Sequence, residues 1–85
     1  MSEPVDITVY SREDCHLCAA ALSRIDEVSD ETAVAVDVTE LEIDDDPELE
    51  AEYGDSVPVV FVEGDREFEY TVDTDELAQV LKTLA

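Results

Sequence analysis

Apolar side chains follow a period of two in two stretches of the chain and a longer period between them. Residues 5–10 and residues 34–38 carry an apolar side chain at every second position, which is the period of a β-strand with one buried face. Between them, apolar side chains recur at spacings of three and four over residues 18–28, which predicts an amphipathic helix of about four turns. A strand, a crossover helix and a second strand form a parallel, right-handed unit in nearly all folds.

The alternation of apolar and polar side chains weakens after residue 38, before a second predicted helix. Residues 39–46 are mostly acidic with two apolar side chains, and they either extend the second strand or form a loop. Asp46 followed by Pro47 matches an N-cap and the first position of a helix, and Gly54 matches a C-terminal stop. These signals predict a short helix.

A hairpin is predicted next. Residues 57–62 are apolar throughout. The period alone does not separate a buried strand from a buried helix, but the β-branched side chains and Pro58 favour a strand buried on both faces. A turn at residues 63–66, followed by the alternation of Phe68 and Tyr70 with glutamates, predicts a hairpin with an edge strand.

An apolar stripe at helical spacing closes the chain. This stripe predicts a helix that begins at residues 73–75. The apolar residues of the stripe are Leu77, Val80, Leu81 and Leu84. The element order is therefore βαβαββα, in one α/β domain over residues 1–85. A chain of this length buries only about 60% of its unfolded surface, so we expect one modest core of sheet and helices.

The net charge is −21, from 25 acidic and 4 basic residues. Leucine, isoleucine, valine and phenylalanine still make up 24 of 85 residues, above the roughly 20% below which disorder is expected, so we expect a folded chain. Such a charge repels nucleic acids and anionic membranes, because phosphate binding depends on lysine and arginine. The acidic side chains also repel one another, which destabilises the compact state in dilute buffer. The composition resembles that of proteins from organisms that balance external salt with internal salt.

No signal for export or membrane insertion is visible. No charged start precedes an apolar signal region, and no apolar run approaches the roughly 18 residues that indicate a membrane helix. We therefore predict a cytoplasmic monomer. The acidic run over residues 40–52 lacks the glycine and the spacing of a calcium-binding EF-hand loop, so we interpret it as a solvated face and predict no metal site.

Cys15 and Cys18 are the only cysteines, and they lie where the first strand is predicted to end and the first helix to begin. The first backbone N–H groups of a helix have no internal partner and are available to a thiolate. Residues three apart in a helix have Cβ atoms about 5–6 Å apart, whereas a disulfide needs about 3.5–4.5 Å, so a small tightening closes the bond. A cysteine pair in a cytoplasmic protein is more often catalytic than structural. We therefore predict a redox-active pair.

These features in this order resemble the glutaredoxin branch of the thioredoxin superfamily over residues 5–84. The motifs that carry the resemblance are Cys15-His16-Leu17-Cys18 after the first strand and Ser56-Val57-Pro58-Val59 at the start of the buried strand, followed by a hairpin and a closing helix. A narrower resemblance, to a small glutaredoxin-like group, rests on Thr8-Val9-Tyr10-Ser11 before the cysteine motif and on Asp46-Pro47-Glu48-Leu49 and Tyr53-Gly54 before Val57-Pro58. The resemblance implies a thioredoxin-like α/β fold, with a central mixed four-stranded sheet flanked by helices.

The functional positions of that family carry over onto four residues. Cys15 would be the exposed nucleophile and Cys18 the resolving thiol. Val57 precedes Pro58, whose peptide bond is cis in this superfamily and faces the dithiol, so the Val57 main chain would pair with a bound thiol substrate. The resemblance thus implies a thiol–disulfide oxidoreductase acting on protein or low-molecular-weight disulfides. A thioredoxin-type protein is one candidate reductant, and no cofactor is implied beyond the Cys15–Cys18 disulfide.

Three features depart from the glutaredoxin pattern. His16-Leu17 replaces the Pro-Tyr often found between the cysteines, and His16 is either an exposed helix-entry residue or a group that tunes the acidity of Cys15. The double glycine that usually follows the hairpin is absent, and Arg12 is the only basic residue near the dithiol. The last two departures disfavour glutathione, because an anionic tripeptide would meet a negative field.

A non-catalytic module is the alternative. Cys18 falls on the apolar stripe of the first helix and on its own suits a core position. In this alternative the fold is a partner-binding or metal-holding scaffold. Cys15, Cys18 and groups from a second subunit would then complete a zinc or iron–sulfur site, since two cysteines cannot supply four ligands. Dimerisation on metal addition would distinguish the two functions.

Overall fold

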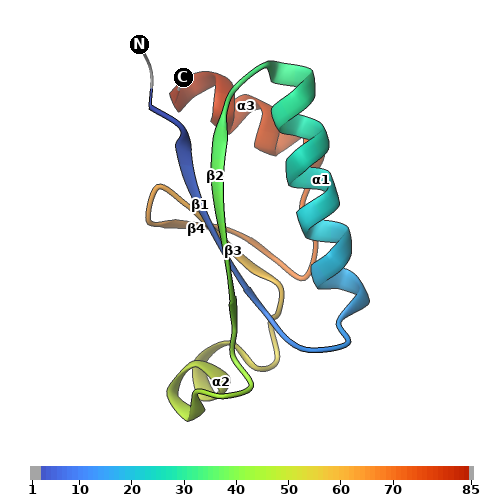
Figure 1. The fold of residues 1–85 in the computed structure, drawn as a ribbon, viewed down its shortest axis with the longest axis vertical. Helices are drawn as coiled ribbons and strands as arrows, with labels where there is room; N and C mark the ends of the chain where they lie inside the picture. Colours follow the sequence, from blue (N-terminus) through green and yellow to red (C-terminus); the bar gives the residue numbers. More distant parts are fainter. Residues whose placement is uncertain (1–2, 85) are drawn as a thin grey trace.

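The helices and strands follow one another in the predicted order. The computed structural model describes residues 3–84. Its elements are β1 (Val5–Ser11), α1 (His16–Thr32), β2 (Val36–Glu42), α2 (Pro47–Tyr53), β3 (Val59–Val62), β4 (Asp65–Glu69) and α3 (Thr74–Leu84). Figure 1 shows α1 running alongside the strands, with α2 beyond the end of the sheet where α1 begins.

The four strands form one mixed sheet in the order β2-β1-β3-β4. β1 pairs with β2 in parallel and with β3 antiparallel, and β3 pairs antiparallel with β4. The predicted thioredoxin-like sheet is therefore confirmed. The parallel register ends with Ser11 beside Glu42, so both strands finish at the same end of the sheet, where α1 begins (Figure 1).

The predicted caps explain where the two shorter helices begin and end. The Asp46 carboxylate accepts hydrogen bonds from the first two N–H groups of α2 at 3.0 and 3.4 Å, and the Asp73 carboxylate accepts them from the N–H groups of Asp75 and Glu76 in α3 at 3.0 and 3.2 Å. Gly54 follows α2 and donates its N–H to the carbonyl of Glu50. A Cβ at position 54 would overlap that carbonyl oxygen, so glycine is required there.

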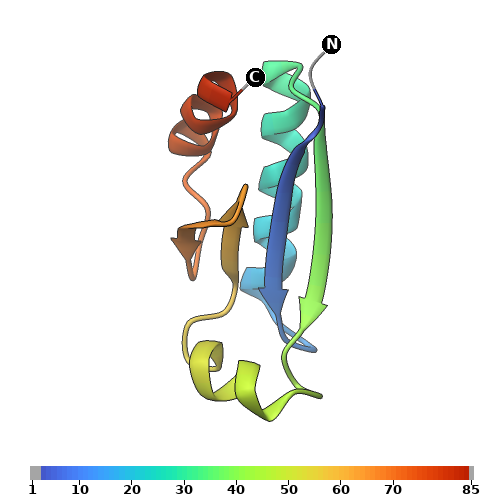
Figure 2. The same ribbon diagram turned by 90° about the vertical axis from the view of Figure 1, so that its left-hand side faces the viewer.

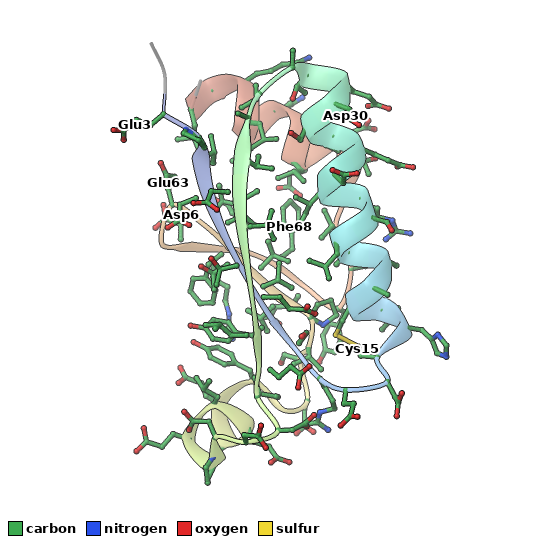
Figure 3. The ribbon with its side chains drawn as sticks, viewed as in Figure 1. Glu3, Asp6, Cys15, Asp30, Glu63 and Phe68 are labelled. Carbon is green, nitrogen blue, oxygen red and sulfur yellow. A yellow bond between two sulfur atoms is a disulfide. The ribbon has the colours of Figure 1, made fainter. Side chains whose placement is uncertain are left out.

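One face of the sheet carries the core. α1 and α3 pack against each other and against this face (Figure 2). Figure 3 shows Phe68 of β4 pointing into the same interior. Full burial of an aliphatic or aromatic side chain stabilises a fold by about 1.5–3 kcal/mol, so this layer holds the sheet and both helices together. Its buried members are Val5, Ile7, Val9, Ala21, Ile25, Val28, Val60, Val62, Phe68, Val72, Leu77 and Leu81.

The opposite face of the sheet carries an aromatic cluster. α2 lies beyond the end of the sheet, not over this face (Figures 1 and 2). Tyr53, the last residue of α2, stacks on Tyr10 with ring centroids 4.7 Å apart, and Phe61 meets both rings edge-on at 5.6 and 6.1 Å. The Arg66 guanidinium lies 5.2 Å from the centre of the Tyr53 ring. These contacts attach α2 to the sheet.

The ends of two strands were not fixed correctly by the sequence pattern. The acidic segment after Val38 extends the second strand as far as Glu42, which decides between the two interpretations left open above. The prediction that Tyr70 belongs to the edge strand was wrong, because β4 ends at Glu69. Tyr70 has a left-handed backbone with φ 67° and is exposed. Its N–H still faces the carbonyls of Pro58 at 2.9 Å and Ser56 at 3.2 Å, so the left-handed backbone at Tyr70 is what ends the strand.

We predict that Tyr53 makes stability fall at alkaline pH. Burial, and after it the charge of Glu52 and the neighbouring Tyr10, raises the pKa of Tyr53 above its ordinary value of 10.0, and Arg66 opposes part of this rise. A raised folded-state pKa means that folding favours the neutral phenol. The stability that neutral Tyr53 contributes is therefore fully present below the ordinary tyrosine pKa and is lost as pH rises through the pKa of the folded state.

Denaturant unfolding measured from neutral pH to above pH 10.0 tests this. Tyr53→Phe should flatten the alkaline loss of stability, whereas Tyr70→Phe, which changes an exposed tyrosine, should keep the wild-type slope. An identical slope in wild type and Tyr53→Phe would contradict the prediction.

Candidate active site

Cys15 and Cys18 lie at the start of α1, joined by a disulfide with Cα atoms 5.2 Å apart. Cys15 is the N-cap residue of the helix, and the Cys18 N–H donates a hydrogen bond to its sulfur at 3.1 Å. A sulfur therefore occupies the place that a serine or aspartate oxygen usually takes at a helix N-terminus. Such a position favours negative charge on the sulfur once the disulfide is reduced.

The two sulfur atoms differ in access. Cys15 is half-buried, whereas Cys18 is only 2% exposed, on the core side of α1. An incoming disulfide therefore has better access to Cys15 than to Cys18. Cys18 reaches Cys15 from the buried side of the helix, as the disulfide between them shows.

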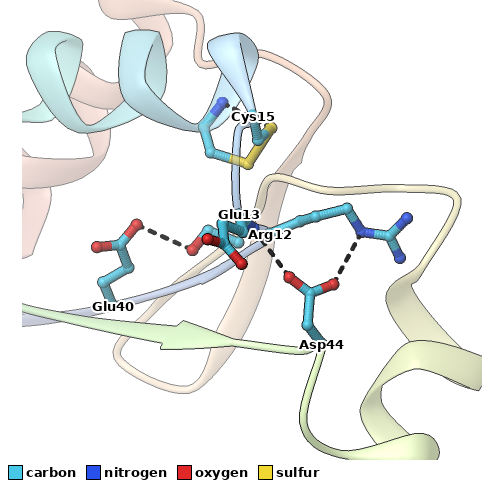
Figure 4. Close-up of a disulfide and its surroundings, with 7 residues drawn as sticks. Arg12, Glu13, Cys15, Glu40 and Asp44 are labelled. Atoms are coloured by element: carbon cyan, nitrogen blue, oxygen red, sulfur yellow. Dashed lines mark hydrogen bonds and ion pairs between the residues drawn. A yellow bond between two sulfur atoms is a disulfide. The ribbon is translucent and has the colours of Figure 1, made fainter.

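Asp44, just after β2, holds the loop that leads into Cys15. Its carboxylate accepts a hydrogen bond from the Glu13 N–H at 2.9 Å and pairs with the Arg12 Nε at 3.5 Å (Figure 4). The Nε atom is buried and makes no hydrogen bond, so this contact is an ion pair only. Arg12 Nη2 also lies 3.6 Å from Glu50 of α2. Figure 4 shows the guanidinium directed away from the disulfide.

Two glutamates of β2 reach the site without having been singled out from the sequence. The parallel register places Glu40 beside Val9 and Glu42 beside Ser11, so both lie on the face of the sheet that α1 covers. Among residues 3–84, Ser11 is the only buried polar residue, and its Oγ donates a hydrogen bond to Glu40 Oε2 at 2.9 Å. The signal that could have shown this is the strand period, because Glu40 and Glu42 continue the every-second-position series of residues 34–38.

A hollow of about 370 Å³ opens beside the disulfide. Four acidic residues and one arginine border it, together with both cysteines and three further residues. Its lining residues are Arg12, Glu13, Asp14, Cys15, His16, Cys18, Ala19, Leu22, Glu40 and Glu42. We call it the dithiol groove. His16 is exposed at its rim, and its role in tuning Cys15 remains a prediction.

A second hollow, of about 390 Å³, lies between the β3–β4 turn and α3. It is slightly larger, but its lining contains no cysteine and no histidine. Since the only groups in these two hollows with thiol–disulfide chemistry are Cys15 and Cys18, we assign the site to the dithiol groove.

The Val57–Pro58 peptide bond is cis, as the family resemblance implied. The last pair between β1 and β3 joins Tyr10 to Val59, so Pro58 lies one residue further on, toward Ser11 and the end of the sheet where Cys15 lies. Val57 is half-buried, and in the described part of the chain its main chain makes no hydrogen bond. The structure thus brings Pro58 to the same end as both cysteines, while the role of Val57 in substrate binding stays a prediction.

Neither a ligand cluster nor a membrane span is found in the part of the chain that the structure describes. Residues 3–84 hold no group of three or more histidine, cysteine, aspartate or glutamate side chains arranged to bind a metal ion. A metal-holding scaffold would therefore need ligands from a second subunit. In the same residues, no helix is long and apolar enough to cross a membrane.

Comparison with known proteins gives one family and several similar structures. The model of a family described as a glutaredoxin-like domain matches residues 6–82. The X-ray structure of protein XcR50 from X. campestris is 33% identical with a TM-score of 0.76, and the match covers 93% of this chain and 99% of that one. The solution structure of protein Ne2328 from Nitrosomonas europaea is 29% identical with a TM-score of 0.78, covering 95% of each chain.

A more distant structure agrees in fold alone. A mutant thioredoxin from Halobacterium salinarum is 22% identical with a TM-score of 0.59, and the match covers 96% of this chain and 75% of that one. Among curated proteins, none gives a significant match.

Proposed function

We propose, since this chain belongs to the glutaredoxin-like domain family, that it is a thiol–disulfide oxidoreductase whose redox centre is the Cys15–Cys18 pair. The observation that carries the proposal is the unequal access of two sulfur atoms within bonding reach of each other at a helix N-terminus. Cys15 is half-buried and its sulfur accepts a hydrogen bond from the Cys18 N–H, while Cys18 is buried beneath it.

The reaction needs only the two thiols and an external disulfide. In the reduced protein, the Cys15 thiolate attacks one sulfur of a substrate RSSR, the substrate S–S bond breaks, and RS⁻ leaves. Cys18 then loses its proton and attacks Cys15 Sγ, which releases the second RS⁻ and forms the Cys15–Cys18 disulfide. Two electrons pass to the substrate, and the two protons of the dithiol end on two molecules of RSH. An external dithiol reverses these steps on the protein and is itself oxidised.

The environment of Cys15 balances two effects. The helix N-terminus favours a thiolate by roughly 0.3–1 kcal/mol at exposed sites. Glu13 and Asp14 directly precede Cys15, and their charges oppose a thiolate by like-charge repulsion. The Val57 main chain, free of hydrogen bonds among residues 3–84, would pair with the substrate beside the attacked sulfur.

A single-turnover measurement tests the proposed function. The protein is reduced, freed of reductant and mixed with excess hydroxyethyl disulfide. We expect release of two small thiols per chain and formation of the Cys15–Cys18 disulfide, both detected by mass spectrometry. Thiol release no faster than from a simple monothiol at the same concentration would overturn the proposal.

We predict that reduced glutathione is a poor electron donor compared with a thioredoxin-type protein dithiol. The groove presents four carboxylates to a tripeptide with a net negative charge, and like charges in one cleft disfavour encounter. Turnover is compared with both donors at matched thiol concentration. A glutathione ethyl ester serves as the control, because it carries less negative charge than glutathione. The ester should donate faster than glutathione, and faster turnover with glutathione than with the protein dithiol would reject the prediction.

The charge also suggests where the protein acts. A net charge of −21 suits a compact state in concentrated salt, where self-repulsion is screened. We therefore propose a monomer acting in a salt-rich cytoplasm, on disulfides of proteins or of small molecules.

A further inference from the structure

We propose that the dithiol groove selects disulfides whose sulfur atoms are flanked by positively charged groups, and that Glu40 and Glu42 are the residues that determine this selectivity. The proposal rests on the proposed oxidoreductase function and names its substrate class. The carboxylates matter because they border the hollow that opens on the redox disulfide.

The first support is placement. Glu40 and Glu42 lie on β2, an edge strand, and on the same face as the buried Val9 and Ser11 with which they pair. Both side chains are exposed, so a ligand can reach them. The Ser11 hydroxyl fixes the Glu40 carboxylate through a 2.9 Å hydrogen bond. Figure 4 shows Glu40 and Glu13 on the same side of the disulfide.

The second support is that the positive charges are paired with other groups or lie outside the groove lining. The chain has 4 basic residues. Arg12 borders the groove, but its guanidinium is paired with Asp44 and Glu50. The other three lie outside the groove lining: Arg24 hydrogen-bonds to Thr71, Arg66 pairs with Glu69, and Lys82 is in the last turn of α3.

The groove therefore presents an excess of negative charge beside the sulfur that is attacked. A cleft lined by one sign of charge raises the local concentration and the association rate of the opposite charge by about 10–1,000-fold. An ammonium group a few bonds from the substrate sulfur would enter with Glu40 and Glu42 as its nearest partners, and a carboxylate in its place would be repelled. The step itself is the one already given, in which Cys15 displaces RS⁻ and Cys18 displaces the second.

The test compares two size-matched disulfides of opposite charge, cystamine and 3,3′-dithiodipropionate. Each rate is divided by the rate of the same disulfide with a neutral small thiol, because the acidity of the leaving thiol itself changes the exchange rate. The readout is the ratio of the two normalised rates. Any general change in the reactivity of Cys15 multiplies both rates and cancels in this ratio.

The groove variant is Glu40→Gln with Glu42→Gln, in which the amide oxygen at position 40 can still accept the Ser11 hydrogen bond. The matched control is Asp30→Asn with Glu31→Gln, which removes the same charge from exposed positions. Asp30 lies at the other end of α1 from Cys15 (Figure 3), about 20 Å away along the axis at about 1.5 Å per residue. Measurements are made at the lowest salt at which circular dichroism shows a folded protein.

We expect the wild type to favour cystamine by about tenfold or more, the lower end of the range for such clefts. The groove variant should lose most of this preference, and the control should keep it. A wild-type ratio near one would overturn the proposal, and so would an equal loss in both variants, which would assign the preference to net charge. Failure of the proposed function looks different, since then hydroxyethyl disulfide is not reduced either.

Discussion

Cys15→Ser is expected to abolish disulfide reduction and rapid alkylation together, whereas Cys18→Ser keeps a reactive thiol and accumulates mixed disulfides with its substrates. The reason is the difference in access, because Cys15 is half-buried at the N-cap and Cys18 is 2% exposed. Without Cys15 no sulfur is reachable. Without Cys18 the first exchange still occurs, but nothing displaces the substrate from Cys15.

Alkylation by iodoacetamide, followed by mass spectrometry, measures both effects. We expect Cys15 in the Cys18→Ser variant to react at least about tenfold faster than Cys18 in the Cys15→Ser variant, since the thiolate is the reactive form and only Cys15 is placed to be stabilised as one. Cys18→Ala is the control, because it removes the sulfur without burying a hydroxyl. Equal alkylation rates at the two positions would contradict the assignment of roles.

The dithiol could be predicted from sequence because its signals are local. The alternation before Cys15 and the helical stripe that includes Cys18 are separate patterns that meet at the cysteine pair. A strand end and a helix start that share a few residues leave little freedom in where the two sulfurs lie. The N-cap position of Cys15 follows directly from that junction.

The groove could not be predicted in the same way, because it depends on strand register. Glu40 lies 29 residues from Ser11 in sequence, and their hydrogen bond exists only because β1 and β2 pair in parallel with Val9 beside Glu40. Composition showed an acidic segment without showing which carboxylates face the dithiol. The end of β4 was missed for another reason, since the alternation of Phe68 and Tyr70 does not show that the Tyr70 backbone is left-handed.

The cis bond before Pro58 came from family resemblance and not from local chemistry. Only about 5–6% of X–Pro bonds in folded proteins are cis, so sequence physics alone favours trans. The structure has the cis bond at the end of the sheet that also holds Cys15. Resemblance and residue patterns therefore contributed different parts of the site.

Molar salt is expected to raise the melting temperature strongly. The net charge of −21 is carried by a domain with a radius of gyration of 12.5 Å. At 0.1 M salt the Debye length is about 10 Å, so charges across much of the molecule repel one another, whereas at 1 M it is about 3 Å and only adjacent charges do. Salt also weakens the ion pairs of Arg12 and Arg66, but exposed pairs contribute only about 0–1 kcal/mol each.

Relief of repulsion should therefore exceed the loss of ion pairs. For a domain of this size, each kcal/mol shifts the melting temperature by about 4–8 °C, so we expect a rise of about 10 °C or more between about 0.1 and 2 M sodium chloride. Chloride is used because sulfate stabilises proteins by exclusion from their surface. Asp30→Asn with Glu31→Gln, which lowers the negative charge by two, should melt higher at low salt and respond less to added salt. A melting temperature independent of salt over this range would show that the acidic surface does not control stability, and that the core against α1 and α3 outweighs it at every ionic strength.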